Sequence, residues 1–446
     1  MDDLNFFRSF YPTKVVYYAG YTAAVLFVLS FFIPLFFSIA VALLVLLGVA
    51  VLLDTFLLYQ KKVGITAERF LAERLSNGDE NNVAIECKNH YSFNAHCVII
   101  EELPVQFQAR SWQRSLTIAR NATGVLQYVL KPVTRGIYDF GYINIYVNGP
   151  LGVVQRRYRC GAPETVPVYP SFIQMRRYQL AAIGNKLQDT GTKQLRKLGH
   201  SSEFEQIKDY VRGDDYRTVN WKATARKGDL MINAFTDERS QPIYCVINKG
   251  RAMKLPFDGM TLLDYAVNAS LALLNVALRK GDKAGLITFS QRVDTFLPAD
   301  KKATQRNALL EALYHQETHF SEPDYEALFA AIRNKITQRS LLVLFTNFES
   351  IESLERQVPF LKKVAHYHLL VVVFFENTEL KTLVEGEAKT IEDIYIKTIA
   401  EKYRHEKRLM IKALHQQGII AVLTTPQQLT VNTLNKYLEL KKRQSI

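Results

Sequence analysis

The stretch GDDYRTVNWKATARKGDL, residues 213–230, combines residue types that could carry out chemistry. Asp214 and Asp215 are adjacent carboxylates, and Lys222 and Arg226 follow within twelve residues. Two carboxylates could bind a metal ion while the cations stabilise a charged transition state. The same side chains could instead form ion pairs among themselves and hold a connecting segment in place. The first alternative predicts a membrane-bound metal-dependent hydrolase, and the second predicts a structural or partner-binding segment.

The charge balance of the wider segment favours the second alternative. Residues 203–239 contain seven Lys or Arg and eight Asp or Glu, a net charge of −1, so they offer no positive stripe for phosphate groups. In this interpretation Trp221 packs, and the segment braces two domains. Arginine is well suited to carboxylate pairing, and the expected pairs are Arg217 and Arg226 with Asp214, Asp215 or Glu238.

Other catalytic patterns are absent from the sequence. It contains no GxxxxGK[ST], HExxH or GxSxG motif, and His200 beside two serines is typical of an exposed loop. The four cysteines have no metal-ligand spacing, which predicts free thiols in a reducing compartment. The formal net charge of +13 makes nucleic acid or an anionic membrane surface a candidate partner.

Apolar runs alternate with helical patterns from residue 241 to the C-terminus. Five runs of the kind found in strands buried on both faces occur at 242–248, 284–290, 341–347, 368–375 and 419–425. Helical patterns lie between and after them, at about 261–280, 302–316, 324–338, 350–364, 390–417 and 426–442. This alternation predicts a doubly wound α/β sheet, in which ligands bind at the carboxyl ends of the strands. From Lys397 onward ten Lys or Arg face three acids, which predicts a solvated or partner-facing helix.

The loop after the first of these strands, INKGRAM at 247–253, resembles the metal-ion-dependent adhesion loop of von Willebrand factor A domains. In that family Asp-x-Ser-x-Ser supplies oxygen ligands, and a further Asp follows a later strand. The resemblance aligns Asn248 with the Asp, Gly250 and Ala252 with the two Ser, and Asn347 with the later Asp. Since two carboxylates become amides and both hydroxyls are lost, we expect a degenerate loop with no metal ion or other cofactor, Mg²⁺ being the ion that an intact loop would bind.

Upstream, the pattern is that of short strands. Alternating runs at 82–89, 95–102, 124–132, 141–148 and 164–170, with turn residues between them, predict a β-sandwich, and residues 62–80 are expected to be a helical or irregular link. Between Pro104 and Cys160 eight cations face only Asp139, which favours a basic module near anionic headgroups. The cations are Arg110, Arg114, Arg120, Lys131, Arg135, Arg156, Arg157 and Arg159.

The first sixty residues predict a membrane anchor. Residues 15–59 carry a single charge, Asp54, and Pro34 would divide them into two spans at about 16–33 and 36–58. Lys and Arg flank the pair on both outer sides, so the positive-inside rule puts both termini and all later domains in the cytoplasm. Asp54, close to the end of the second span, is expected to be a solvated helix-end residue rather than a proton relay.

Nearly all of the chain resembles the bacterial domain-of-unknown-function 58 family, von Willebrand factor A-like proteins encoded beside a MoxR-type AAA+ ATPase. The resemblance is carried by the two spans, by TRGIYDFG, NGPLGVV and VPVYPSF, and above all by the block GHSSEFEQIKDYVRGDDYRTVNWKATARKGDLMINAFTDERSQPIYCVIN. It implies a structural or partner-binding role, and no catalytic one, for Glu203, Phe204, Tyr210, Gly213, Asp214, Arg217, Trp221, Lys222, Ala225, Arg226, Glu238 and Arg239.

The expected organisation has four parts: a transmembrane hairpin (1–62), a β-sandwich-like domain (63–170), a connector carrying the family block (171–240) and a von Willebrand factor A-like α/β domain (241–446). The resemblance implies a non-enzymatic adaptor in the bacterial inner membrane. Its expected partners are a MoxR-type ATPase, other membrane or envelope proteins and the anionic membrane surface, in envelope assembly or stress tolerance. Two alternatives stay open: the hydrolase that uses Asp214 and Asp215, and a protein that binds nucleic acid or an envelope polymer, although no specific nucleic acid is expected.

Overall fold

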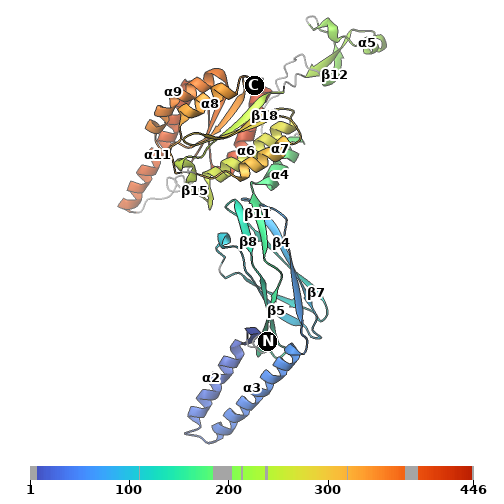
Figure 1. Cartoon of the computed structure of the whole chain (residues 1–446), viewed down its shortest axis with the longest axis vertical. Coiled ribbons are helices and arrows are strands. Elements are labelled where there is room, and N and C mark those ends of the chain that lie inside the picture. Colours follow the sequence, from blue (N-terminus) through green and yellow to red (C-terminus); the bar gives the residue numbers. More distant parts are fainter. Residues whose placement is uncertain are drawn as a thin grey trace. The chain divides into compact units, whose positions relative to one another are not determined.

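The protein divides into two compact units, Met1–Tyr169 and Pro170–Ile446, each with hydrophobic cores of its own. They are seen here in a computed structural model of the 446-residue chain (Figure 1). The structure describes residues 8–109, 111–183, 203–211, 214–236, 240–318, 320–376 and 390–443.

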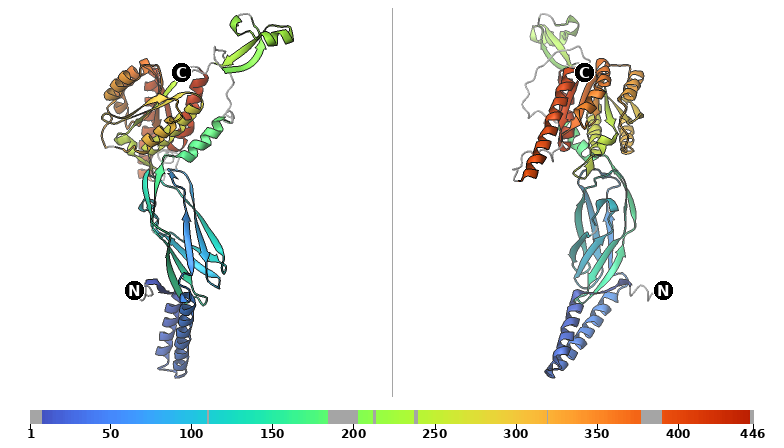
Figure 2. Two further views of the ribbon diagram at one scale, coloured as in Figure 1. Left: turned by 45° about the vertical axis from the view of Figure 1, so that its right-hand side comes forward. Right: turned by 90° about the vertical axis from the view of Figure 1, so that its left-hand side faces the viewer.

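Two apolar helices, α2 (Lys14–Leu29) and α3 (Leu35–Tyr59), lie side by side in the first unit (Figure 2). Pro34 immediately precedes α3, where its missing N–H costs no helical hydrogen bond. The rings of Phe27 and Phe37 meet edge to face across the pair, with centroids 5.9 Å apart. Among the described residues, α3 is the one helix long and apolar enough to cross a membrane, and α2 is a shorter apolar helix.

Three sheets make up the rest of the first unit, with antiparallel pairing except between β3 and β11. The strands in sheet order are β1 (Phe10–Pro12), β10 (Val154–Cys160), β9 (Ile143–Asn148), β5 (Ala95–Glu101) and β6 (Gln113–Ile118); β2 (Ile65–Phe70), β4 (Asn81–Asn89) and β7 (Thr123–Leu130); and β3 (Leu75–Ser76), β11 (Glu164–Tyr169) and β8 (Gly136–Phe140). The five strands expected here from alternation begin and end within two residues of β4, β5, β7, β9 and β11.

Alternation along the strands builds the core of this unit. In β4 every second residue is buried, from Asn81 to Asn89, and β5 shows the same alternation. Ile85 of β4, Ile99 of β5 and Ile145 of β9 belong to one buried cluster. The five-stranded sheet and the β2–β4–β7 sheet therefore share a core, as the inward faces of half-buried strands require.

The expected link at 62–80 is instead part of the sheet. β2 pairs along its length with β4, from Ile65 opposite Asn89 to Phe70 opposite Ala84. Its sequence ITAERF buries Ile65 and Ala67 and exposes Thr66 and Glu68. A strand with one face in water keeps only alternate positions apolar. In this short segment the apolar residues are too few, and do not alternate strictly enough, to have indicated a strand.

Asp54 joins α3 to the strands. The side chain is fully buried (0 % exposed), and its carboxylate accepts hydrogen bonds from the backbone N–H groups of Leu151 (2.9 Å), Val153 (2.9 Å) and Val154 (3.3 Å), between β9 and β10. Gly149 in the same turn leaves the necessary room, because a Cβ there would lie 2.4 Å from the Asp54 carboxyl carbon. The expectation of a solvated helix-end residue is therefore wrong: three N–H donors compensate the burial of this carboxylate.

Arg156 of β10 caps the other side of the same junction. Its guanidinium donates to the carbonyl oxygens of Leu58 (2.6 Å), Lys61 (2.8 Å) and Lys62 (3.1 Å) and lies over the ring of Tyr59, 4.2 Å from its centroid. Leu58 lies in the last turn of α3, where a helix leaves carbonyls unpaired and a cation is favourable, and Lys61 and Lys62 follow shortly after the helix. The residue counted as part of a headgroup-facing basic patch thus contributes to the fold of the first unit.

Two more of the eight cations make contacts within the unit. Arg157 donates to the Asn144 side-chain oxygen at 3.0 and 2.7 Å, and Arg159 lies 3.5 Å from the centroid of the Tyr142 ring. These partners are neutral, so the arginines keep their charge while their side chains are held in place within the unit. Arg110 lies outside the described residues.

A six-stranded sheet dominates the second unit. Five strands are parallel and β18 is an antiparallel edge strand. Because the first strand, β14, lies in the middle of the sheet, the chain changes direction between β14 and β19, which makes the gap between their carboxyl ends a topological switch point. The order is β18 (Val293–Asp300), β17 (Lys283–Phe289), β14 (Pro242–Asn248), β19 (Leu341–Phe345), β20 (Leu369–Phe375) and β21 (Ile420–Thr424).

Helices cover both faces of this sheet (Figure 1), each over its own apolar cluster. Strands and helices begin and end close to the ranges expected from the apolar runs. One face carries α4 (Phe172–Ile183), α6 (Leu262–Arg279), α7 (Gln305–Tyr314) and α12 (Leu429–Lys442). The other carries α8 (Tyr325–Lys335), α9 (Ile351–Tyr367) and α11 (Ile391–Gln416), and β15 (Pro256–Phe257) and β16 (Met260–Thr261) form a short hairpin.

The family block contains a small folded element. β12 (Glu203–Asp209) and β13 (Met231–Thr236) pair antiparallel, and α5 (Trp221–Lys227) lies between them in the sequence. The Asn220 side chain caps α5 by accepting from the Ala223 N–H (3.0 Å) and donates to the Asn233 side chain (2.8 Å). Gly228 ends α5 with a φ of +83°, which glycine adopts without strain.

Candidate functional site

The carboxyl ends of β14 and β19 bring together the loop that resembles a metal site. Asn248 ends β14 and is fully buried. Its side-chain oxygen accepts from the Gly250 N–H (2.8 Å), and its amide nitrogen donates to the Thr346 hydroxyl (2.9 Å), which also hydrogen-bonds to the Tyr325 hydroxyl (2.7 Å). The side chain of Asn248 is therefore used to close the loop onto the end of β19.

Gly250 stands where the resemblance places the first serine. A Cβ at this position would lie 2.9 Å from Cδ of Pro323, 3.0 Å from the Ser321 carbonyl oxygen and 3.1 Å from Oδ1 of Asn248. The close approach favours glycine and leaves no room for a serine hydroxyl in this loop geometry. Ala252 follows in the 3-10 turn Arg251–Lys254 and offers no oxygen ligand.

Asn347 is bound by a lysine from α11. The Lys407 amine donates to the Asn347 side-chain oxygen (2.9 Å) and to the Phe348 carbonyl oxygen (2.5 Å), and it lies 5.8 Å from the centroid of the Phe374 ring. Burial lowers the pKa of Lys407 to about 8, while the charges of Glu349 and Glu406 act in the opposite direction. The Lys407 ammonium is thus bound to the Asn347 side-chain oxygen, which is the atom that would face a metal ion.

A divalent cation does not fit this donor set. Asn248 and Asn347 already make hydrogen bonds through their side-chain oxygens, the two serine positions carry no hydroxyl, and the ammonium of Lys407 would repel a second cation. Within the described ranges no group of three or more His, Cys, Asp or Glu side chains is placed to hold a metal ion.

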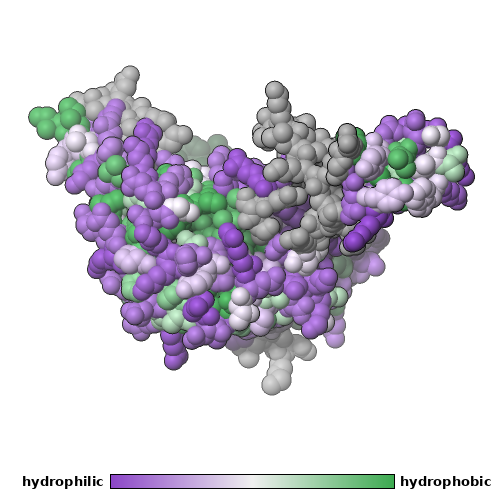
Figure 3. Space-filling model, turned by 90° about the horizontal axis from the view of Figure 1, so that it is seen from above, coloured by the Kyte–Doolittle hydropathy of each residue, from purple (hydrophilic) through white to green (hydrophobic). Residues whose placement is uncertain are grey.

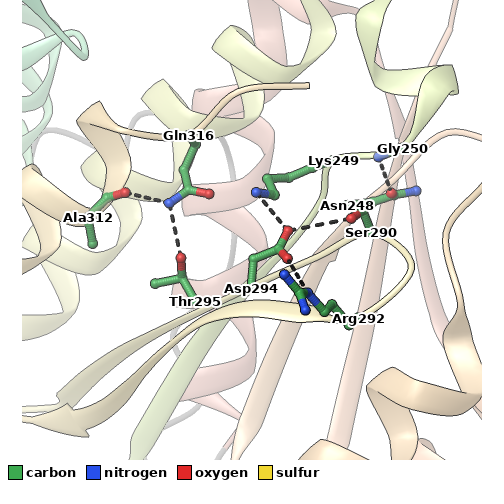
Figure 4. A network of polar contacts seen from close by, with 9 residues as sticks. All are labelled: Asn248, Lys249, Gly250, Ser290, Arg292, Asp294, Thr295, Ala312 and Gln316. Atoms are coloured by element: carbon green, nitrogen blue, oxygen red, sulfur yellow. Dashed lines mark hydrogen bonds and ion pairs between the residues drawn. The ribbon is translucent and has the colours of Figure 1, made fainter. Parts of the chain in front are cut away.

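A second lysine, Lys249, is buried next to Asn248 (Figure 4). Lys249, only 5 % exposed, forms an ion pair with Asp294 (2.8 Å), which also lies 3.8 Å from the Arg292 guanidinium and 3.5 Å from the Ser290 hydroxyl. These contacts link the ends of β14 and β17 and the start of β18. The Asp294 carboxylate, which is not itself buried, neutralises the buried Lys249 ammonium and stiffens the edge of the sheet.

A hollow of about 140 Å³ lies at the switch point. It has space for a single side chain rather than for a nucleotide or other large ligand. Its charges are mixed, and Arg251 pairs there with Glu349 at 3.3 Å, both side chains more than half exposed. The lining residues are Arg251, Ala252, Glu322, Pro323, Tyr325, Asn347, Phe348, Glu349, Ser350, Ser353, Arg356 and Gln357.

The two carboxylates of the family block act as local caps. Asp214 accepts from the Val211 N–H (3.0 Å) and pairs with Lys208 (3.3 Å), and these hydrogen bonds lower its pKa. Asp215 accepts from the Arg217 N–H (2.9 Å) at the start of the 3-10 turn Tyr216–Thr218. Asp214 thus pairs with a lysine rather than with one of the expected arginines, and Lys227 pairs in the same way with Asp209.

Trp221 does not pack as expected. It is 60 % exposed, and its ring makes an edge contact with that of Tyr216, which is 61 % exposed, at a centroid distance of 5.9 Å. Lys222, Ala225 and Arg226 of α5 are exposed as well.

The remaining residues of the block fall into two groups. Some are positioned by backbone hydrogen bonding, and the others lie outside the described residues. Glu203 and Phe204 pair in β12 with Thr236 and Phe235 of β13, and the Tyr210 N–H donates to the Leu230 carbonyl oxygen (2.8 Å). Gly213, Glu238 and Arg239 lie outside the described residues, as does the expected pairing with Glu238.

Sequence reasoning missed Lys249, Asp294 and Lys407. For Lys407 a signal existed: Ala400, Met410 and Leu414 form the buried stripe of α11, and Lys407 falls on it, three residues before Met410. A lysine at an apolar position of a helical pattern indicates a buried partner. The buried position of Lys407 was missed because the residue was counted among the charges of a solvated helix.

Comparison with known proteins now places the chain. Residues 206–400 match the family described as "Protein of unknown function DUF58", the family that the sequence resemblance indicated. The chain is 22 % identical over 239 residues to "Uncharacterized protein YeaD" of Bacillus subtilis (strain 168). The match covers 50 % of this chain and spans 55 % of the length of that relative.

Solved structures show only remote likeness. Proximal thread matrix protein 1 from the mussel byssus is 12 % identical, with 45 % of each chain covered and a TM-score of 0.27. The CARDB domain of the PF1109 protein from Pyrococcus furiosus is 14 % identical, with 23 % of this chain and 86 % of that chain covered and a TM-score of 0.18. Scores this low carry no argument about fold or function.

Proposed function

We propose that this protein is a membrane-anchored adaptor that binds protein partners on the cytoplasmic side of the bacterial inner membrane. In this proposal α2 and α3 are both spans, both termini are cytoplasmic, and the second unit contains a von Willebrand factor A-like binding module. A MoxR-type AAA+ ATPase is the proposed principal partner, in envelope protein assembly or stress tolerance.

The observation that carries the proposal is the attachment of α3 to the folded first unit. Asp54 accepts three hydrogen bonds from backbone N–H groups between β9 and the start of β10. Arg156 donates three hydrogen bonds to carbonyl oxygens at and just after the end of α3. An apolar helix whose outer surface is exposed over most of its length needs an apolar environment. A protein that mounts such a helix directly on a folded unit is suited to hold that unit at a membrane.

The α/β sheet supports binding rather than catalysis. The amides of Asn248 and Asn347 are engaged in hydrogen bonds at the switch point, and Asp214 and Asp215 accept backbone N–H groups in their own turns. These four side chains, on which metal or hydrolase chemistry would depend, are thus used in hydrogen bonds of the local fold. The hydrolase alternative therefore has no observation in its favour, and adaptor function is the better proposal.

The direct test is a crosslinked pull-down from native membranes with the intact chain as bait. The expected result is co-purification of a MoxR-type ATPase encoded in the same genome. An Arg217→Ala, Trp221→Ala double variant should recover less of it, because both substitutions remove exposed side chains of the family block. An Arg306→Ala variant, which changes an exposed cation of α7, is the matched control. Recovery of no such ATPase by the intact chain would count decisively against the proposal.

A further inference from the structure

We propose that the family block is a docking element for an acidic, partly apolar segment of a partner protein. The element consists of β12, β13, α5 and the 3-10 turn Tyr216–Thr218. The proposal rests on the adaptor function proposed above and adds the place and the chemistry of the contact.

An aromatic pair marks the centre of the surface. Tyr216 and Trp221 are each about 60 % exposed and touch edge to face. Val211 (63 % exposed) and Leu230 (41 % exposed) add apolar area on the same small element. Exposed Trp and Tyr side chains are the commonest energetic centres of protein interfaces. In Figure 3 the block lies at the right of the view and shows hydrophobic residues, in green, among hydrophilic ones, in purple.

Three exposed cations lie on the same small element as the aromatic pair. Arg217 adjoins Tyr216, Lys222 adjoins Trp221, and Arg226 lies one helical turn from Lys222, so all three belong to the same part of the element. All three side chains are exposed, and none forms an ion pair with another residue of the described chain. These cations are available to carboxylates of a partner.

Four of the six acids in the described part of the block interact within it, among them Asp229, whose charge acts on Lys227. Asp209 pairs with Lys227 (2.5 Å), Asp214 with Lys208 (3.3 Å), and Asp215 accepts the Arg217 N–H. The surface around the aromatic pair therefore combines apolar area with cations whose charge is not neutralised locally. Charge complementarity then selects a segment that carries Asp or Glu next to apolar side chains.

A protein segment fits this surface better than a lipid bilayer does. The described part of the block contains five cations and six acids, so its net charge of −1 creates no attraction toward anionic headgroups at a distance. Its positive character is confined to three side chains beside two rings. Such a local pattern is recognised by a partner that approaches within contact distance.

The presentation of the surface is built into the fold. Asn220 caps α5 and ties it to Asn233 of β13, while the Met231 N–H donates to the Thr224 hydroxyl (3.0 Å). Such an anchored turn of helix loses little conformational freedom on binding, which favours affinity.

The experiment uses the full chain in native membranes, with the photoreactive residue p-benzoylphenylalanine replacing Tyr216. After illumination the crosslinked peptides are identified by mass spectrometry. We expect crosslinks to a protein segment that has more Asp and Glu than Lys and Arg. The same photoreactive residue at Tyr395, an exposed tyrosine of α11, is the control site and should not label that segment.

Charge reversal sharpens the test. Arg217→Glu, Lys222→Glu and Arg226→Glu together should lower the yield of this crosslink by at least about tenfold, because carboxylates would then face carboxylates. A control with three exposed cations reversed elsewhere, Lys88→Glu, Arg306→Glu and Lys362→Glu, should keep the yield. Crosslinks to lipid, to this chain itself or to neutral or basic segments, or no crosslink at all, would overturn the proposal, as would a yield that survives reversal.

The inference and the adaptor proposal can fail separately. If the intact chain recovers the ATPase but reversal of the three cations changes nothing, the docking element is refuted and the adaptor role stands. If position 216 labels an acidic segment of some other protein and no MoxR-type ATPase is recovered, the docking element stands and the ATPase partnership fails.

Discussion

Asp54 is the residue on which the attachment of the apolar helices depends most directly. A carboxylate inside an apolar helix is costly unless it is fully hydrogen-bonded, and here three N–H groups of the β9–β10 turn supply the bonds. The sequence placed this acid correctly at the end of a predicted span. It could not reveal the partners, because they lie about a hundred residues away and offer only backbone atoms.

Replacement of Asp54 by Ala should lower the free energy of unfolding of the first unit by about 3 kcal/mol, because three buried N–H groups lose their acceptor. Urea unfolding in detergent can be followed by Trp112 fluorescence in a Trp221→Phe background, since the protein has two tryptophans. Gly149→Ala should destabilise the wild type but cost much less beside Asp54→Ala, which removes the carboxyl that its Cβ would meet. Strictly additive effects of the two substitutions would contradict the contact.

Lys407 makes the stability of the second unit depend on pH. Burial lowers its pKa from 10.5 to about 8, so between these values the unfolded chain binds more protons than the folded one. The free energy of unfolding therefore rises as the pH increases from about 8 to about 10.5. Below this range the buried charge costs about 3 kcal/mol.

A Lys407→Met variant should lose this dependence. The free energy of unfolding of the wild type relative to the variant should rise by up to about 3 kcal/mol between pH 7 and pH 10.5. Denaturant titrations of both proteins across this range measure it, and the tyrosines and cysteines that titrate in both cancel in the difference. A difference that stays constant with pH would show that Lys407 is not held as described.

Among the elements, the strands and helices of the α/β sheet were the most predictable from sequence. Runs such as PIYCVIN and HLLVVVFF are apolar throughout because β14 and β20 are buried on both faces. The antiparallel strand β18 was not predicted, since VDTFLPAD is only half-buried and contains a proline, which edge strands tolerate. In the family block the charge balance indicated pairing correctly but could not distinguish lysine from arginine as the partner of each acid.

The C-terminal helix α12 is fixed to the sheet by one buried carboxylate. Asp282, at the start of β17, accepts from the Tyr437 hydroxyl (2.6 Å) and the Lys441 amine (2.8 Å), while the Gln241 N–H donates to its other oxygen (3.1 Å). These contacts could not be predicted from the sequence, because Gln241 lies 41 residues from Asp282 and the two α12 residues lie 155 and 159 residues from it.

Tyr437→Phe should lower the free energy of local unfolding of α12 by about 1.5 kcal/mol, because a hydrogen bond to a charged acceptor is lost from a buried site. Hydrogen exchange of the amides in Leu429–Lys442 should become faster, while the other strands of the sheet keep their protection. The control is Tyr395→Phe, which changes an exposed tyrosine. Unchanged exchange in Tyr437→Phe would mean that Asp282 does not hold the helix.

At the scale of the whole molecule, the sequence indicated the order of an apolar segment, a strand-rich module and an α/β sheet. The details that matter for function lay in tertiary contacts: a carboxylate that joins helix to strands, a lysine on an amide oxygen and a tryptophan left at the surface. The first two were hidden because the contacting residues are far apart in the chain. The position of Trp221 was mispredicted because a tryptophan in a charged segment suggests packing within the chain. Its exposure instead favours contact with a partner.

Reconstitution tests the central proposal, a membrane-anchored adaptor for a MoxR-type ATPase, most directly. The purified full chain is placed in lipid vesicles, the purified ATPase from the same genome is added, and the vesicles are sedimented. The ATPase should sediment with vesicles that contain the protein and stay in solution with empty vesicles, and the Arg217→Glu, Lys222→Glu, Arg226→Glu variant should bind at least about tenfold less of it. An ATPase that stays in solution in the presence of the intact protein would contradict the account.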